Sequence, residues 1–242
     1  MSTQPTPQPA TPAALFAQHP AASDAQEAKD QRKFEKWRKS LSYITGIGLS
    51  EQDKIEYKKG LDKELENYQC KQCVTWRDTF MKNSPAVIFM LDNLKKVGCP
   101  LTKELMQCMP CDATRSGGFS PEHGVLLCQN RFFNKRHQED TMVHEMIHMY
   151  DHCRFNVDWS DCRHHACSEV RAASLSGDCR WSREVRRGFY TFTKQHQVCV
   201  KRRAILSVKQ NSCCTEPGVA ERAVASVFES CFKDTRPFDE IY

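Results

Sequence analysis

The spacing of apolar and polar residues along the chain is mostly that of amphipathic helices, with apolar positions three to four residues apart. The clearest of these helices is residues 85–97, in which Pro85 lies near the start and Gly98 follows the end as a C-cap. Another helix is expected where Asp140 and Thr141 can cap a run with an apolar side. The remaining pattern predicts helices at residues 29–42, 51–67, 85–97, 167–173, 180–192, 194–211 and 217–232.

The pattern changes in residues 108–133. Gly117-Gly118 and Pro121–Gly124 mark turns, and the short apolar run Gly124–Cys128 is suited to a strand. Helices in most of the chain and strands in one short region predict an α+β domain, mostly helical, with a small antiparallel sheet.

The first 30 residues differ in composition from the rest of the chain. Residues 1–30 are rich in Pro, Ala, Gln and Thr, contain no Cys and have almost no large apolar side chain. Such a segment cannot bury enough surface to offset its ordering entropy, so a disordered tail is expected, with one domain over residues 31–242. The first basic residue is Lys29, and the segment therefore lacks the features of a signal peptide or an Arg-rich presequence. No apolar stretch approaches the roughly 18 residues of a membrane span.

Fourteen cysteines lie between Cys70 and Cys231. An even number at this density favours a disulfide framework formed in an oxidising compartment. The alternative is a structural zinc site made by Cys70-x-x-Cys73 and Cys108-x-x-Cys111. The separation between these pairs exceeds the usual spacing of zinc ribbons, which favours disulfides.

The formal net charge of +5 is modest. The basic residues are scattered and not interleaved with aromatic residues, so a nucleic-acid partner is not expected. One basic group is predicted to form a solvated helix face, or alternatively a patch for a membrane surface or an acidic partner. It comprises Lys201, Arg202, Arg203 and Lys209.

The segment 136–153, which contains no Pro or Gly, carries the strongest chemical signal. His144 and His148 are four residues apart, so both imidazoles lie on one helix face and can bind one metal ion. Glu145 lies beside them, where it can take a proton from an attacking water. This H-E-x-x-H pattern is typical of zinc peptidases. The strand at Gly124–Cys128 precedes it, either as an edge strand for an extended substrate or as plain hairpin core.

A catalytic zinc site needs a third protein ligand and an open position for water. Glu169 is favoured because it lies in a second predicted helix with an E-x-x-A pattern. Asp151 and His152 are alternatives, but a ligand from just past His148 needs a chain break that no Gly provides. Asp151 is then suited to orient a ligating imidazole. The prediction is one catalytic Zn²⁺ held by His144, His148 and Glu169, with Asp151 as the alternative third ligand and Glu145 as the general base.

A further hydrogen-bond donor for the developing oxyanion is also expected in such a site. The candidates are His164, His165, Arg171 and Tyr150.

With these residues identified, the chain resembles the mitochondrial inner-membrane metallopeptidases that process and assemble ATP synthase subunit 6. The similarity covers roughly residues 55–242 and includes the segments His144–Asp151, Ala166–Cys179 and Cys231–Phe238, together with the many cysteines. It does not extend to the N-terminal tail.

The resemblance implies a zincin-like core in the intermembrane space, attached peripherally to the inner membrane. It implies cleavage of the N-terminal extension of the subunit 6 precursor and help in assembling the membrane sector of ATP synthase. It also implies that other small intermembrane-space proteins are substrates and that import depends on oxidation of cysteines. The alternative is a non-catalytic assembly factor or chaperone for membrane-sector subunits.

Overall fold

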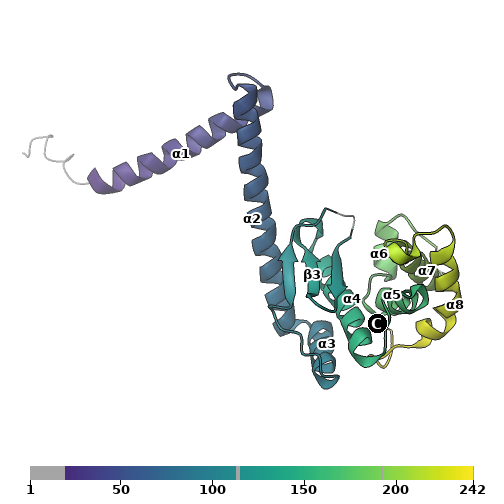
Figure 1. Ribbon diagram of the computed structural model, residues 1–242. Coiled ribbons are helices and arrows are strands. Elements are labelled where there is room, and N and C mark those ends of the chain that lie inside the picture. Colours follow the sequence, from purple (N-terminus) through teal and green to yellow (C-terminus); the bar gives the residue numbers. More distant parts are fainter. Residues whose placement is uncertain (1–19, 113–114, 192, 242) are drawn as a thin grey trace, which may run out of the picture. The chain divides into compact units, whose positions relative to one another are not determined.

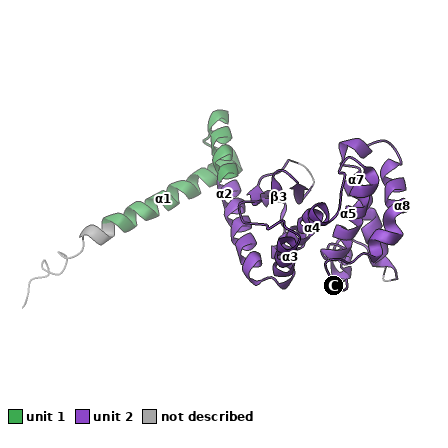
Figure 2. Ribbon diagram, turned by 60° about the horizontal axis from the view of Figure 1, so that its bottom comes forward, with its two compact units in different colours: residues 1–63 green, residues 64–242 purple. Residues whose placement is uncertain are grey.

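The structure is a computed structural model that describes residues 20–112, 115–191 and 193–241. The chain forms two compact units, residues 1–63 and 64–242 (Figure 2). The first unit contains helix α1 (Pro20–Thr45) and the beginning of helix α2 (Glu51–Asn83), where the rings of Tyr43 and Tyr57 meet with centroids 5.2 Å apart. Within the described residues, no helix combines the length and apolar character needed to cross a membrane.

The N-terminal region differs from the sequence prediction. Residues 1–19 of the predicted disordered tail lie outside the described residues, but residues 20–30 belong to α1. The stretch from Asp24 to Asp30 consists of Ala, Gln, Glu, Lys and Asp, of which all but Asp are strong helix formers that need no burial to favour a helix. The compact units also divide after Lys63, not at the predicted boundary after residue 30.

The first part of the second unit, residues 64–161, is called here the sheet half. It contains the end of α2, helix α3 (Pro85–Lys96), a three-stranded sheet, the 3₁₀ turn η2 (Gln129–Arg131) and helix α4 (Lys135–Arg154). The strands are β1 (Met106–Met109), β2 (Gly117–Ser120) and β3 (Gly124–Cys128), in the order β1-β3-β2.

The sheet is mixed, which corrects the prediction of an antiparallel sheet. β2 pairs antiparallel with β3, but β1 pairs parallel with β3, with Met106 opposite Val125. β2 and β3 are consecutive strands that form an antiparallel hairpin. β3 also lies beside β1 and runs in the same direction, so that pair is parallel. Gly124 permits this close approach, because it has a φ of +80° and a Cβ there would lie 2.3 Å from the Leu105 carbonyl oxygen. Gly117 and Gly118, expected in a turn, lie within β2.

The second part, residues 162–241, is called the helical half. It contains α5 (Cys162–Leu175), α6 (Trp181–Arg186), α7 (Gln195–Val208), the 3₁₀ turn η3 (Ser212–Cys214) and α8 (Val219–Lys233). Helix α6 is shorter than the predicted helix at 180–192 because Gly188, with a φ of +85°, ends it.

Helices α4 and α5 pack against each other where the two halves meet (Figure 1). Each half has its own apolar core, and α5 contributes to both. Its Ala172 and Leu175 pack into the core of the sheet half, whereas Ala166, Val170 and Ala173 pack against α7 and α8. The small side chains allow neighbouring elements to approach α5 closely. The prediction of a mostly helical α+β domain is confirmed.

Twelve of the cysteines form six disulfides, which confirms the predicted disulfide framework. Cys73 and Cys111 bond to different partners and Cys70 is a free thiol, so the alternative four-cysteine zinc site does not form. Of the disulfides between described residues, three lie in each half and none joins the halves. The pairs are Cys73–Cys108, Cys99–Cys153, Cys111–Cys128, Cys162–Cys214, Cys167–Cys231 and Cys179–Cys199.

Candidate metal centre

Helix α4 supplies two imidazoles to the centre. The helix begins at Lys135, where the Asn134 side chain accepts a hydrogen bond from a backbone N–H of the first turn, and not at the predicted cap of Asp140 or Thr141. His144 and His148 lie one turn apart on the same face, with ring centroids 4.8 Å apart. Both side chains face α5.

Helix α5 supplies the third predicted ligand. Glu169 is buried, with Oε2 3.6 Å from Nε2 of His144 and Oε1 3.4 Å from Nε2 of His148. Tetrahedral ligands about 2.1 Å from a zinc ion would be about 3.4 Å from one another. The spacing and chemistry of these three groups therefore fit a zinc ion. Among the described residues, they form the one His/Cys/Asp/Glu cluster with metal-site spacing.

A hydrogen-bond chain determines which nitrogen of His148 is free to bind a metal. The Ser168 hydroxyl donates to Asp151 at 2.8 Å, so its oxygen is left to accept a hydrogen bond. Nδ1 of His148 lies 2.7 Å from that oxygen and must donate to it, which leaves the lone pair on Nε2. Asp151 thus acts on His148 through Ser168 and is not one of the clustered ligand groups.

The Glu169 carboxylate is held by neighbours other than the two predicted ligands. The Ser207 hydroxyl donates to Oε1 at 2.5 Å, and Nε2 of His165 is 3.2 Å from the same oxygen. The side-chain amide of Asn211 is 3.0 Å from Nδ1 of His165, and its N–H donates there, so Nε2 carries the proton that points at Glu169. Burial opposes ionisation of Glu169, but His148 and the hydrogen bonds hold its pKa well below the usual range.

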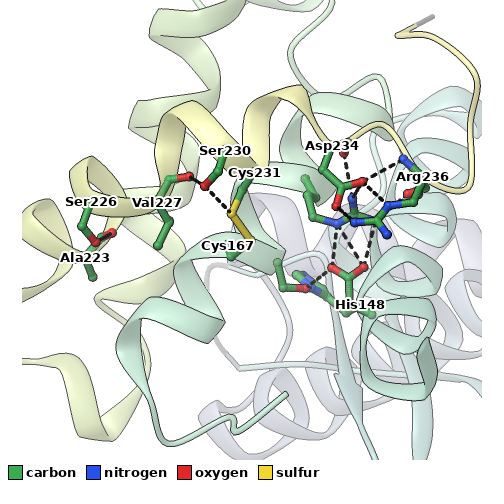
Figure 3. Close-up of a disulfide and its surroundings, with 12 residues drawn as sticks. His148, Cys167, Ala223, Ser226, Val227, Ser230, Cys231, Asp234 and Arg236 are labelled. Carbon is green, nitrogen blue, oxygen red and sulfur yellow. Dashed lines mark hydrogen bonds and ion pairs between the residues drawn. A yellow bond between two sulfur atoms is a disulfide. The ribbon is translucent and has the colours of Figure 1, made fainter. Parts of the chain in front are cut away.

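A buried arginine connects this chain to the C-terminal segment. Arg171 binds the Asp151 carboxylate through Nε at 3.1 Å and through Nη2 at 3.0 Å. The same guanidinium donates to the backbone carbonyls of Asp234 and Arg236. The disulfide Cys167–Cys231 lies beside this network (Figure 3). A fully paired buried network of this kind restricts the orientation of His148.

Glu145 lies next to His144 on α4, in a buried position on the wall of a cavity. Burial raises the pKa of Glu145 to about 7; the charge of Glu169 adds to this shift, while His148 and Arg115 oppose it. A carboxylate with a pKa near neutrality is suited to accept and return a proton. Strand β2 passes close to the Glu145 carboxylate at Gly117, where a Cβ would come within 2.9 Å of Oε1.

The four predicted oxyanion donors lie in other surroundings. His165 contacts Glu169, and Arg171 binds Asp151. His164 accepts a hydrogen bond from the backbone N–H of Asp158, and the ring of Tyr150 packs edge-on against Phe155. None of the four lines the cavity beside Glu145.

The edge-strand interpretation of Gly124–Cys128 is wrong, because β3 is the central strand. The edge strand beside α4 is β2. The sequence prediction missed it because Gly117 and Gly118 have no side chain to signal a strand.

Sequence reasoning also missed the roles of Ser168 and Ser207. Ser168 adjoins Glu169 in the sequence, but a serine next to a predicted ligand does not by itself indicate a contact with His148. Ser207 lies 38 residues after Glu169, and no pattern in the sequence connects the two.

A cavity of about 610 Å³ opens beside the metal centre and runs between β2, α4, α6 and α7. Its walls are rich in arginine, some of it from the basic group at 201–209. The prediction of a plain solvated face for that group needs correction, because Arg202 pairs with buried Glu184 and Arg203 with Asp178. Lys209 pairs with Glu221.

Known proteins similar to the chain include three fungal relatives, each named mitochondrial inner membrane protease atp23. The Neosartorya fischeri protein is 48% identical over 208 residues, which cover 85% of this chain and 87% of that protein. The Candida albicans protein is 45% identical over 214 residues, covering 86% and 90%. The Eremothecium gossypii protein is 47% identical over 219 residues, covering 86% and 89%.

No solved structure matches the chain. The sequence does match the Peptidase M76 family over residues 71–239, a range that includes the three clustered ligand groups, Glu145 and the cavity. Both the match and the relatives cover most of the chain. This protein therefore belongs to the Peptidase M76 family.

Proposed function

We propose that the chain is a zinc-dependent endopeptidase of the mitochondrial intermembrane space that removes the N-terminal extension of the ATP synthase subunit 6 precursor. Its family makes it a metallopeptidase, and the proposal adds the metal, the substrate and the compartment. The observation that carries the proposal is that His144, His148 and Glu169 lie at the spacing of a metal site, with buried Glu145 beside them. Assistance in assembling the membrane sector of ATP synthase, and cleavage of other small intermembrane-space proteins, belong to the same proposal.

The protein residues have separate roles in this reaction. His144, His148 and Glu169 would hold the ion, which when bound supplies a Lewis acid that acidifies water and polarises a peptide carbonyl. Glu145 accepts the proton of the attacking water at its carboxylate and delivers it to the leaving amine. Ser168 and Asp151 keep His148 in the required tautomer, and Ser207 and His165 hold Glu169.

Strand β2 is the element best placed to align a substrate. It is an edge strand, and its residue Gly117 lies directly against Glu145. An extended peptide can pair with such an edge through backbone hydrogen bonds. The missing side chain at Gly117 lets the strand pass this close to the general base, because a Cβ there would come within 2.9 Å of Oε1 of Glu145.

The test is cleavage of a subunit 6 precursor peptide by the oxidised, zinc-loaded protein, with Glu145→Gln as the matched variant. The Gln variant keeps the shape and a hydrogen-bonding group but cannot accept the proton. We expect it to bind zinc like the parent and to lose at least about 100-fold in kcat. Full activity of the Gln variant would exclude the general-base role.

The same variant separates the two proposed activities. If Glu145→Gln restores ATP synthase assembly in cells that lack the protein, then assembly does not require cleavage. If neither protein cleaves the precursor peptide, the proposed substrate is wrong.

We place the protein peripherally at the inner membrane, on the intermembrane-space side. Three observations support this location: the printed names of the relatives, the six disulfides, which suit an oxidising compartment, and one exposed face of α1. Four apolar residues spaced three or four apart form that face, and their side chains are 44% to 76% exposed. Around the helix axis, Lys33 flanks the face on one side and Arg38 on the other. An apolar face between basic residues suits an anionic lipid surface. The face consists of Phe34, Trp37, Leu41 and Ile44.

A further inference from the structure

The cavity beside the metal centre has an excess of positive charge. Seven arginines and three carboxylates line it. Arg183, Arg187 and Arg203 are committed to carboxylates, since all three contact Asp178 and Arg183 also contacts Asp140. No ion pair with a carboxylate involves the other four within the described part of the chain. These four, called here the free arginines, are Arg115, Arg131, Arg136 and Arg186.

The free arginines come from separate segments. Arg115 precedes β2, Arg131 ends η2, Arg136 lies in the first turn of α4 and Arg186 ends α6. Like charges gathered around one concave site repel one another, and a bound anion relieves this repulsion. A second sign of the positive field is His137 on the cavity wall, whose pKa is lowered to about 4 by burial and then by Arg183.

The cavity is continuous with the reaction centre. Gly117, His144 and Glu145 form part of the same wall as the arginines. A peptide whose scissile bond lies beside Glu145 must therefore place neighbouring side chains in or near this positive field. Arginine binds carboxylates with two parallel hydrogen bonds, which is a stronger and more directional contact than a single charge provides.

We propose that this cavity selects substrates with acidic side chains close to the scissile bond and that the free arginines are the specificity-determining residues. The inference rests on the proposed peptidase function and adds the class of substrate. It assigns to the cavity one or more Asp or Glu side chains, located on one side of the cleaved bond.

Phosphate, from a lipid or from solution, is another oxyanion that arginine binds through paired hydrogen bonds. The acidic peptide is favoured because the wall includes the predicted general base and a predicted metal ligand, Glu145 and His144. An anion fixed there occupies the space in which the reaction takes place. A phosphate or a lipid headgroup would compete with the substrate.

The first measurement compares kcat/KM for peptides of one neutral sequence in which single glutamines on either side of the scissile bond are replaced by glutamate. We expect at least one glutamate position on one side to raise kcat/KM by about 10- to 100-fold, the range of a hydrogen-bonded charge contact. The gain should decrease with added salt. Equal rates for all peptides would overturn the inference while leaving the peptidase function in place.

The second measurement locates the preference. Arg136→Gln and Arg186→Gln, separately and together, should lower the glutamate gain, which is the ratio of kcat/KM for the glutamate peptide to kcat/KM for the all-glutamine peptide. Arg163→Gln is the matched control, because Arg163 is an exposed arginine on α5 outside the cavity wall. An unchanged gain in the double variant, or the same loss in the control, would contradict the assignment.

Binding gives a readout that does not require turnover. Fluorescence anisotropy with Glu145→Gln protein should show tighter binding of the glutamate peptide than of its glutamine counterpart, and the double arginine variant should reduce the difference. If inorganic phosphate or phosphatidylglycerol vesicles displace the peptide at concentrations well below those of free glutamate, the cavity is a phosphate site and the inference is wrong. Charge-dependent binding without cleavage of any peptide would support the selectivity and refute the proposed function.

Discussion

A single serine hydroxyl determines the state of His148. Ser168 can donate only one hydrogen bond, and Asp151 takes it. The remaining contact at 2.7 Å requires the proton of His148 to be on Nδ1. Asp151 is itself held by Arg171, so the orientation of one imidazole depends on three other residues of α4 and α5.

Removing this hydroxyl should weaken metal binding. In Ser168→Ala, His148 loses its orienting partner and can place the proton on Nε2. We expect the zinc affinity, measured by competition with a chelator, to decrease by about 10- to 100-fold.

Ser174→Ala is the control for this variant. Ser174 is also a buried serine on α5, but its hydroxyl has no hydrogen-bond partner among the described residues. Its replacement should leave zinc affinity unchanged. Equal affinities of the Ser168→Ala protein and the parent would show that the hydroxyl does not set the tautomer.

The clustering of His144, His148 and Glu169 could be predicted because their relation is local or follows from a known helix pattern. His144 and His148 are related by one helical turn, and Glu169 belongs to a second pattern 21 residues after His148. The supporting residues were not predictable in the same way. Ser207 and Asn211 reach the site only because α7 and the turn after it pack beside α5, which no sequence spacing records.

At the scale of secondary-structure elements, the close passage of β2 over α4 depends on one glycine. A Cβ at Gly117 would lie 2.8 Å from Cγ2 of Thr141 and 2.9 Å from Oε1 of Glu145. A Cβ at Gly118 would have no neighbouring atom within 4 Å. The two neighbouring glycines therefore form a matched pair.

We expect Gly117→Ala to displace β2 or Glu145 and to lower kcat by about 100-fold, as a misplacement of about 1 Å can do. Zinc content should stay at the level of the parent, because the ligand groups are not contacted. Gly118→Ala should have a much smaller effect on kcat. Steady-state kinetics and metal analysis of both proteins test this, and equal activities of the two variants would contradict it.

The exposed face of α1 gives a prediction about membrane binding. Replacement of Trp37 and Leu41 by serine removes apolar area from that face without changing charge. In a vesicle sedimentation assay with anionic lipid, we expect the bound fraction of the doubly substituted protein to decrease several-fold.

A suitable control is Tyr190→Ser, which removes an aromatic ring that is 73% exposed in the second unit. The control should bind vesicles like the parent. Unchanged binding of the Trp37/Leu41 variant would show that α1 is not the attachment surface.

The helices were more predictable than the sheet for a physical reason. Residues 85–97 and 217–232 carry complete helical repeats, and the ends of the observed α3 and α8 lie within two residues of the predicted ends. The strands have four or five residues each, and the pairing of β1 with β3 joins segments separated in the chain. Such a pairing depends on tertiary packing, which a local pattern does not contain.

On the scale of the whole molecule, buried ion pairs help to connect the helices around the cavity. The Asp178 carboxylate is 9% exposed and lies 2.7 Å from both Arg187 and Arg203. Burial opposes its ionisation, but the arginines hold the pKa of Asp178 far below its usual range.

This shift predicts a loss of stability in acid. The charged form is favoured in the folded state, so the stabilisation is complete above the unfolded pKa of about 3.9 and disappears as the pH falls below it. In Asp178→Asn, the free energy of unfolding at pH 7 should decrease by roughly 3 kcal/mol, at the low end of values for breaking buried pairs. The further decrease between pH 5 and pH 2 should be smaller than in the parent.

Denaturant unfolding at several pH values measures this effect. Asp92→Asn serves as a control, because Asp92 is an exposed carboxylate on α3 without an ion pair in the described chain. It should leave both the stability at pH 7 and its pH dependence close to those of the parent. The same pH dependence in the Asp178→Asn protein as in the parent would contradict the assignment.

The distribution of disulfides between the halves also affects how the chain can reach its oxidised state. The six bonded cysteines of residues 73–153 pair only among themselves, as do the six of residues 162–231. Twelve cysteines can pair in about 10,000 ways, but two separate sets of six offer only about 225 combinations. A chain that is oxidised progressively from its N-terminal side can complete the first set before the second is present. The search for the correct pairing then becomes two short problems in succession, and an error in one half leaves the other intact.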